Sequence, residues 1–270
     1  MVRHCNARFI KLIVLFFLLL LVACRLDRIS FEPSGREIFS TQDSHALTTD
    51  VYGGNSRQES DYFLVVLTRS VNMNFDDPNS FYQSITARED GSVGHAWILL
   101  GKGSTFIECG HTGEFGLINM RYHEAVKKAI RDKKKNPISY LWEDLQDGKY
   151  EEYYMTEKPT YAARFELTEK EYKNIYDYIN TYDYGRFSIT KDSCTFFATN
   201  ACALMGIDLG HLARINVPKY YTVSNNRYNM WDEEKYSIIS IGAPDILEKS
   251  LKMAVKAGLG KDVTDWYYKQ

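Results

Sequence analysis

Two β-rich runs joined by a short glycine-containing turn constrain the fold of this chain more than any other feature. The runs are VGHAWILL, residues 93–100, and STFIEC, residues 104–109. The intervening Gly101-Lys102-Gly103 is a hairpin signal, because glycine adopts the backbone conformations that tight turns need. A hairpin joins antiparallel strands. We therefore expect an antiparallel sheet at the centre of the domain.

The rest of the pattern predicts a mixed α+β domain around that sheet. Clusters of β-branched and aromatic residues predict further strands at residues 62–68, 138–142, 161–167 and 236–241. Helical spacing and capping signals predict helices at residues 121–135, 169–182, 192–206 and 243–260. We find no internal repeat and no second-domain boundary. The expected fold is one α+β domain over residues 61–270, with a helical extension at its C-terminus.

The helix expected at residues 169–182 has the most specific start signal. Thr168 and Glu171 fit a capping box, in which each side chain bonds to the backbone amide of the other residue. The positions that recur at helical spacing are mostly aromatic: Tyr172, Ile175, Tyr176, Ile179 and Tyr182. We expect these tyrosines to pack on the core.

Composition excludes one broad class of partner. The chain has 270 residues, 44% hydrophobic and 25% charged, with a formal net charge of −2. These values suit a folded globular protein. Proteins that bind nucleic acid usually carry a strongly basic surface, so we expect no nucleic-acid partner.

The N-terminal segment is typical of an exported protein. Three basic residues precede an apolar run over residues 12–23, which is too short for an ordinary membrane-spanning helix and fits a signal peptide. The run ends in LVAC, which resembles the bacterial lipobox, a pattern cleaved before its cysteine. The resemblance implies a signal peptide over residues 1–23, a lipid anchor on Cys24 and a flexible tether over residues 24–60.

The residue after the lipobox cysteine bears on location. In Gram-negative lipoproteins an Asp at this position retains the protein at the inner membrane, and this chain has Arg25. The resemblance therefore implies the periplasmic side of the outer membrane if the organism is Gram-negative. A non-lipidated signal peptide cut nearby and an uncleaved anchor are the alternatives.

The cysteine count leaves at least one thiol free. Cys5 lies in the signal peptide and Cys24 is blocked if lipidated, so Cys109, Cys194 and Cys202 remain. The last two are eight residues apart on one expected helix, about 12 Å along its axis. A disulfide needs α-carbons within about 7 Å, so these two cannot bridge, and an odd count leaves one thiol unpaired.

Cys194 has the position of a nucleophile. Asp192 or Ser193 suits the N-cap and would place Cys194 in the first helical turn. The free amides and the dipole of a helix start favour a thiolate, and the same amides can donate to a developing oxyanion. The alternative is a small buried cysteine. Cys202, two turns deeper, is expected to be buried and inert.

The hairpin supplies a base and a carboxylate for that nucleophile. His95 follows Gly94 at the start of one strand, and Glu108 lies near the end of the next. Residues so spaced can lie side by side across a tight hairpin, depending on register. A carboxylate beside an imidazole fixes its tautomer and supports its charged form. The alternatives are a core histidine and a solvent-facing glutamate.

This order of a histidine strand, an acidic strand and a late cysteine helix resembles the circularly permuted branch of the NlpC-type papain-like cysteine peptidases. The lecithin:retinol acyltransferase-like proteins are relatives of that group. The resemblance covers residues 62–241 and is strongest at residues 93–108 and 167–207. It implies a permuted papain-like fold, in which a central antiparallel sheet packs against helices that include the nucleophile helix.

The resemblance also implies roles for individual residues. Cys194 corresponds to the nucleophile, His95 to the general base and Glu108 to the orienting residue, while Tyr184 corresponds to a tyrosine near the site. Many permuted members have Asn immediately before the cysteine, where this chain has Ser193; serine caps a helix equally well.

The implied activity is a cysteine hydrolase or acyltransferase that works through a thiol acyl-enzyme. For a tethered envelope protein, the resemblance favours peptidase or amidase action on peptide amide bonds of peptidoglycan. Lipid acyl groups are the alternative substrate, because the permuted branch includes lipid-directed enzymes. No cofactor is expected.

Two rival interpretations use other residues. A zinc site from His95, Glu108, Cys109 and His111 has suitable ligand types, but it lacks a second clustered pair and no HExxH is present; we expect no metal, with His111 in a loop near the cleft rim. A non-catalytic lipoprotein could bind sugar or lipid through the aromatic residues at 217–231 and 265–270. An enzyme requires Cys194 within reach of His95, whereas a binding protein does not.

Overall fold

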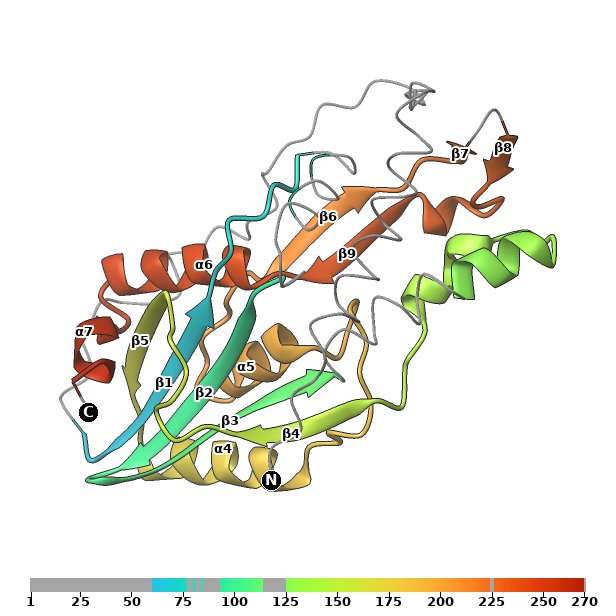
Figure 1. Ribbon diagram of the computed structural model, residues 1–270. Coiled ribbons are helices and arrows are strands. Elements are labelled where there is room, and N and C mark those ends of the chain that lie inside the picture. The colour runs from blue at the N-terminus through green and yellow to red at the C-terminus, as the bar shows by residue number, and fades with distance from the viewer. Residues whose placement is uncertain are drawn as a thin grey trace, which may run out of the picture.

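An antiparallel six-stranded sheet forms the centre of the molecule, and its strands lie in the order β10-β5-β1-β2-β3-β4 (Figure 1). The computed structural model describes residues 60–76, 80, 84, 93–113, 125–223 and 226–269. The strand bounds are β1 Tyr62–Arg69, β2 His95–Lys102, β3 Thr105–Gly113, β4 Gly148–Glu152, β5 Tyr161–Glu166 and β10 Lys261–Asp262. The expected α+β class with a central antiparallel sheet is confirmed.

The predicted signal peptide, Cys24, Arg25 and nearly all of the predicted tether lie outside the described residues. Within the part of the chain that the structure describes, no helix is long and apolar enough to cross a membrane.

The predicted hairpin is confirmed as β2 and β3. The register pairs Lys102 with Thr105, so β2 runs past the residues we assigned to the turn. Gly103 makes the reversal with φ +56, a left-handed conformation that favours glycine.

Both faces of the sheet are buried, and helices cover them unequally. Along β2, Ala96 and Ile98 belong to a large core cluster, whereas Trp97 and Leu99 belong to a second cluster on the other face, because side chains alternate along a strand. The large cluster includes buried residues of α4 Glu169–Thr181, α5 Cys194–Ala203 and α6 Pro244–Lys256. Figure 1 shows α5 between the other two helices. The second face packs against α7, Thr264–Tyr267.

The α4 prediction is confirmed in its start and in most of its buried face. Both hydrogen bonds of the Thr168–Glu171 capping box are present. Ile175 and Ile179 are buried, and Tyr172, Tyr178 and Tyr182 pack against the large cluster. Tyr176 is the exception: it is 41% exposed, so its expected place in the core was wrong.

One predicted strand is a helix. Residues 138–142 belong to the 3₁₀-helix η1, Pro137–Trp142. Proline at its first position has a helix-compatible φ and lacks the N–H that a ladder requires. Ile138 is buried in a small separate cluster with Met230 and Trp231.

The remaining elements lie outside the central sheet. The predicted strand at 236–241 is present as β9, Ile238–Gly242, but it pairs with β6, Leu212–Asn216, in a two-stranded sheet. A second such sheet pairs β7 Tyr220–Val223 with β8 Asn226–Asn229, and η2 spans Glu234–Tyr236. Of the helix expected at 121–135, residues 125–131 are helical.

Candidate active site

Strands β2 and β3 separate at the end of the hairpin that lies far from the turn. Their pairing ends at Ile98 and Cys109, although β2 begins at His95 and β3 continues to Gly113. Figure 1 shows the strands diverging at these ends, and α5 packs against both of them. This separation leaves backbone groups of β2 available to the start of α5.

Cys194 is the first residue of α5 and is half-buried. The backbone amides of Ala96, Thr195 and Cys194 itself lie close enough to its sulfur to lower its pKa. Because Ala96 directly follows His95, this proximity to β2 places the thiol beside the strand that carries the expected base.

The start of α5 has no side-chain cap. Ser193 occupies the N-cap position, as expected, but its side chain makes no capping hydrogen bond. Its hydroxyl instead bonds to the Thr195 hydroxyl at 3.1 Å. Gly242, at the end of β9, passes so close that a Cβ there would lie 2.6 Å from Ser193 Oγ. The amides of the first turn therefore stay available to the thiol.

The thiol is nevertheless harder to ionise than an ordinary cysteine. Burial raises the pKa of Cys194 to about 11, and the three amides and the Arg69 charge offset only part of that increase. The amides of the helix start lower the thiol pKa, as expected, but desolvation of the charged sulfur outweighs them in the resting protein.

His95 is held at the beginning of β2 by its neighbours. Gly94 has φ +86, and a Cβ there would lie 2.6 Å from the Arg69 carbonyl oxygen, so this position requires glycine. His95 pairs with Arg69 of β1. Burial lowers the pKa of His95 to about 3, with smaller contributions from Arg69 and His111. At neutral pH the imidazole and the Cys194 thiol are therefore both uncharged.

The contacts of His95 differ from those that the resemblance implied. Its ring stacks on Trp97, and its Nε2 lies 2.8 Å from the Tyr153 hydroxyl oxygen. Among the described residues, the imidazole has no hydrogen bond to Cys194 Sγ or to Glu108. Tyr153 was missed because it lies in EEYYM, a run of acidic and aromatic residues that matches no motif.

Glu108 is buried on the same side of the hairpin as Trp97, but its hydrogen bonds go to groups other than His95. Its Oε1 accepts from the Trp97 indole N–H at 2.8 Å and from the Tyr267 hydroxyl at 2.7 Å. Its Oε2 accepts from the Met155 amide at 2.6 Å. The register pairs Glu108 with Leu99, so Trp97 lies between the carboxylate and His95. The expected direct contact of Glu108 with His95 is not made.

Tyr184 and His111 belong to an aromatic cluster. The Tyr184 hydroxyl donates to the Ile179 carbonyl oxygen at 3.1 Å, and its ring contacts those of His111 and Tyr182. His111 lies on β3 and is fully buried, so its expected place in a loop at the cleft rim was wrong. Burial lowers the pKa of His111. Tyr184 therefore packs behind the site and makes no hydrogen bond to the Cys194 thiol.

The other cysteines and the residues of the rival zinc interpretation lie in separate places. Cys109, Cys194 and Cys202 are free thiols. Cys202 is fully buried, as expected, and burial raises its pKa. Glu108 and Cys109 are neighbours on one strand and face opposite sides of the sheet. The described residues contain no group of three or more His, Cys, Asp or Glu that could hold a metal ion.

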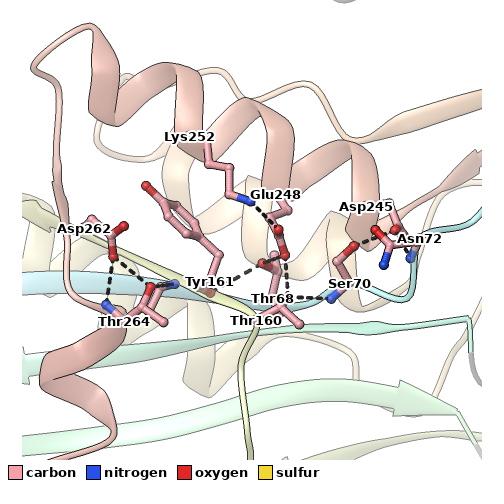
Figure 2. A network of polar contacts seen from close by, with 11 residues as sticks. Thr68, Ser70, Asn72, Thr160, Tyr161, Asp245, Glu248, Lys252, Asp262 and Thr264 are labelled. Carbon is pink, nitrogen blue, oxygen red and sulfur yellow. Dashed lines mark hydrogen bonds and ion pairs between the residues drawn. The ribbon is translucent and has the colours of Figure 1, made fainter.

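Two buried carboxylates of α6 fix the end of β1 (Figure 2). Arg69 at this end pairs with His95. Asp245 Oδ1 accepts from the Ser70 hydroxyl and from the amides of Asn72 and Met73, at 2.5, 2.6 and 3.2 Å. Glu248 accepts from the hydroxyls of Thr68 and Thr160 and from Lys252. This network holds one wall of the site in place.

Comparison with protein-family models, with curated proteins and with solved structures finds no match to this chain.

Proposed function

We propose that this protein is a cysteine hydrolase or acyltransferase of the cell envelope with a permuted papain-like arrangement, in which Cys194 is the nucleophile and His95 the general base. One observation carries the proposal. The amide of Ala96, the residue after His95, lies close enough to Cys194 Sγ to lower its pKa, at an uncapped helix start. A thiol is thus held beside the base strand and among free backbone amides.

The proposed chemistry follows from these groups. His95 removes the thiol proton while Sγ attacks the carbonyl carbon of an amide or ester, and a C–S bond forms. The backbone amides at the start of α5 donate to the oxyanion. His95 then gives its proton to the leaving amine or alcohol as the C–N or C–O bond breaks. Water, or another acceptor, then attacks the thioester and gives its proton to His95; the C–S bond breaks, the acid or acyl-transfer product leaves, and His95 returns the proton to the sulfur.

The resting pair is uncharged in this proposal. With a thiol pKa of about 11 and an imidazole pKa of about 3, proton transfer must accompany the attack rather than precede it. Both shifts come first from burial, and a bound substrate would keep water away from the pair in the same way. The site therefore fits general-base catalysis better than a preformed thiolate–imidazolium pair.

A lipid anchor on Cys24, as predicted from the sequence, would place the domain next to the cell wall. We propose peptide amide bonds of peptidoglycan as the substrate, and an outer-membrane location on the periplasmic side if the organism is Gram-negative. Lipid acyl groups are the alternative within the same chemistry. The Arg25 position and the expected tether support this location.

The test uses the full chain in detergent with two substrates, isolated peptidoglycan and phospholipid vesicles. Wild type and Cys202→Ala should release peptide fragments from peptidoglycan, whereas Cys194→Ala and His95→Ala should not. Cys202 is the matched control, because it is a buried cysteine on the same helix. Mass spectrometry should also find an acyl thioester on Cys194. Release of fatty acid instead of peptide would select the lipid-directed alternative.

A second candidate function is a non-catalytic binding lipoprotein. The raised thiol pKa and the missing Sγ–imidazole hydrogen bond favour it. It predicts that neither substrate is cleaved and that Cys194→Ala binds peptidoglycan or lipid as tightly as wild type does.

A further inference from the structure

The His95 imidazole is held by two aromatic residues. One face stacks on Trp97, with ring centres 5.6 Å apart and planes 14° from parallel. Its edge meets the Tyr153 ring, and Nε2 lies 2.8 Å from the Tyr153 hydroxyl oxygen. Among the described residues this is the only hydrogen bond of the imidazole, which leaves Nδ1 without a partner there.

A second contact of Tyr153 decides which atom supplies the hydrogen of that bond. The Tyr153 hydroxyl donates to Glu151 Oε2 at 3.1 Å, and an ionised carboxylate can only accept. A tyrosine hydroxyl has one hydrogen, so its remaining lone pair must accept from His95. The neutral imidazole carries a single N–H. With that hydrogen on Nε2, Nδ1 is the unprotonated and basic atom.

We propose that Tyr153, oriented by Glu151, is the positioning residue of His95 and holds the tautomer in which Nδ1 is free to accept the Cys194 proton. Glu108 does not make this contact, although the resemblance assigned it the role. The inference rests on the proposed function only for the source of the proton. The tautomer is a property of the resting protein.

The electrostatics of the cluster agree with this arrangement. Burial raises the pKa of Tyr153 well above its usual range, and the nearby Glu151 and Cys194 raise it further. Tyr153 therefore keeps its hydroxyl hydrogen, and it lies within electrostatic reach of the thiol. His95 stays neutral for the same first reason, burial, so only its tautomer needs to be fixed.

Glu108 supports the position of His95 indirectly, through the residues that contact the imidazole. Its Oε1 holds the Trp97 indole that stacks under His95, and its Oε2 holds the Met155 amide, two residues after Tyr153. Both supports of the imidazole therefore lead back to one buried carboxylate. Loss of Glu108 would disturb the positions of Trp97 and Tyr153 together, whereas loss of the Tyr153 hydroxyl would change only the tautomer.

The test measures the tautomer directly in the full chain in detergent, labelled with ¹⁵N-histidine. The His95 signals are identified by their loss in His95→Gln, and the protonated nitrogen is read from the two ring ¹⁵N shifts. The variants are Tyr153→Phe and Glu151→Ala. The matched control is Tyr154→Phe, because Tyr154 donates to Glu152 in the same way, is 72% exposed and has no contact with His95.

Wild type and Tyr154→Phe should carry the His95 hydrogen on Nε2. Tyr153→Phe should shift it wholly or partly to Nδ1, and Glu151→Ala should give a mixture. Peptidoglycan turnover should fall in Tyr153→Phe by roughly tenfold or more in kcat, with little change in KM, because the wrong tautomer cannot act as the base.

Two results would overturn the inference: an Nδ1–H tautomer in wild type, which needs no variant to be seen, or the same tautomer in wild type and Tyr153→Phe. The proposed function fails separately. If the tautomer responds as expected but no substrate is cleaved, Tyr153 positions His95 in a protein that is not this hydrolase.

Discussion

The starts of α4 and α5 show how differently two helices of one domain treat the same backbone groups. Thr168 and Glu171 close the start of α4 with a capping box. At the start of α5, Ser193 turns its hydroxyl to Thr195, and the amides of the first turn reach the sulfur of Cys194 instead. A missing cap costs about 1 kcal/mol, so the open start of α5 needs support from elsewhere.

That support comes from the helix body and from the site around it. Six of the ten residues of α5 are buried, against two of the thirteen in α4. The helix that forgoes its cap is thus the one held most firmly by the core. The comparison indicates that the uncapped amides of α5 form part of a site and are not merely the end of a helix that lacks a cap.

The strongest test of the comparison is the pH dependence of the Cys194 thiol. Burial raises the pKa of Cys194 to about 11. At any pH below that pKa, the thiolate fraction grows about tenfold for each unit by which the pH rises. We expect alkylation by iodoacetamide to rise roughly 1000-fold between pH 6 and pH 9, as followed by mass spectrometry of the Cys194 peptide.

A free cysteine, whose pKa is about 8.5, should level off within the same experiment. Fast labelling of Cys194 already at pH 6, slowed in His95→Ala, would contradict this prediction. It would mean that the helix-start amides and a charged His95 lower the thiol pKa by more than burial raises it. Cys194 and His95 would then form a thiolate–imidazolium pair in the resting protein.

The second test removes the core support of α5. Phe197 is fully buried and its ring contacts Tyr178 and Tyr182. Phe197→Ala should lower the free energy of unfolding by about 3–5 kcal/mol, as is usual for a buried phenylalanine. Urea unfolding measures this change.

Phe196, the preceding residue on the helix, is only half-buried, so Phe196→Ala is the matched control and should cost clearly less. Equal losses would mean that α5 is not held chiefly through its buried face.

Acid should destabilise the fold through His95. Above pH 6.5 the imidazole is neutral in both states and contributes no pH dependence. Below pH 6.5 the His95 imidazole of the unfolded chain binds a proton, whereas in the folded protein it stays neutral down to about pH 3. The stability of the fold therefore falls as the pH falls. His95 is half-buried, which limits the loss to about 1–2 kcal/mol between pH 6.5 and about pH 4.5.

Urea unfolding of wild type and His95→Gln at pH 7 and near pH 4.5 measures this loss. The variant should lose less than wild type over that range. His111 and His211, whose pKa values burial also lowers, are present in both proteins and cancel in the comparison. An identical loss in the two proteins would contradict a His95 that stays neutral in the folded protein.

Local patterns in the sequence predicted the local structure well. The hairpin turn, the capping box of α4 and the start of α5 at Cys194 all follow from residues within a few positions of each other. The failure at residues 138–142 has a local and a long-range cause. Pro137 starts a 3₁₀-helix there, and Ile138 packs with Met230 and Trp231, which lie far away in the sequence.

The candidate site shows the same limit. Spacing in the hairpin indicated His95 and Glu108, but which residue bonds to the imidazole depends on β4 packing beside β3, so Tyr153 was not predictable. The raised pKa of Cys194 likewise results from the burial of the whole helix start, which a local argument about free amides does not include.

The smallest expected effect tests the comparison most directly, because it removes the N-cap hydroxyl from each helix. In α4 the Glu171 amide donates to Thr168 Oγ1 at 3.2 Å. Thr168→Ala should therefore cost about 1 kcal/mol of stability and speed hydrogen exchange at that amide, with Thr168→Ser restoring both. Ser193→Ala removes no cap bond, so exchange at the first-turn amides of α5 and the alkylation rate of Cys194 should stay within about twofold of wild type. Faster exchange there would mean that Ser193 caps α5 in solution, and that the two helix starts differ less than their contacts indicate.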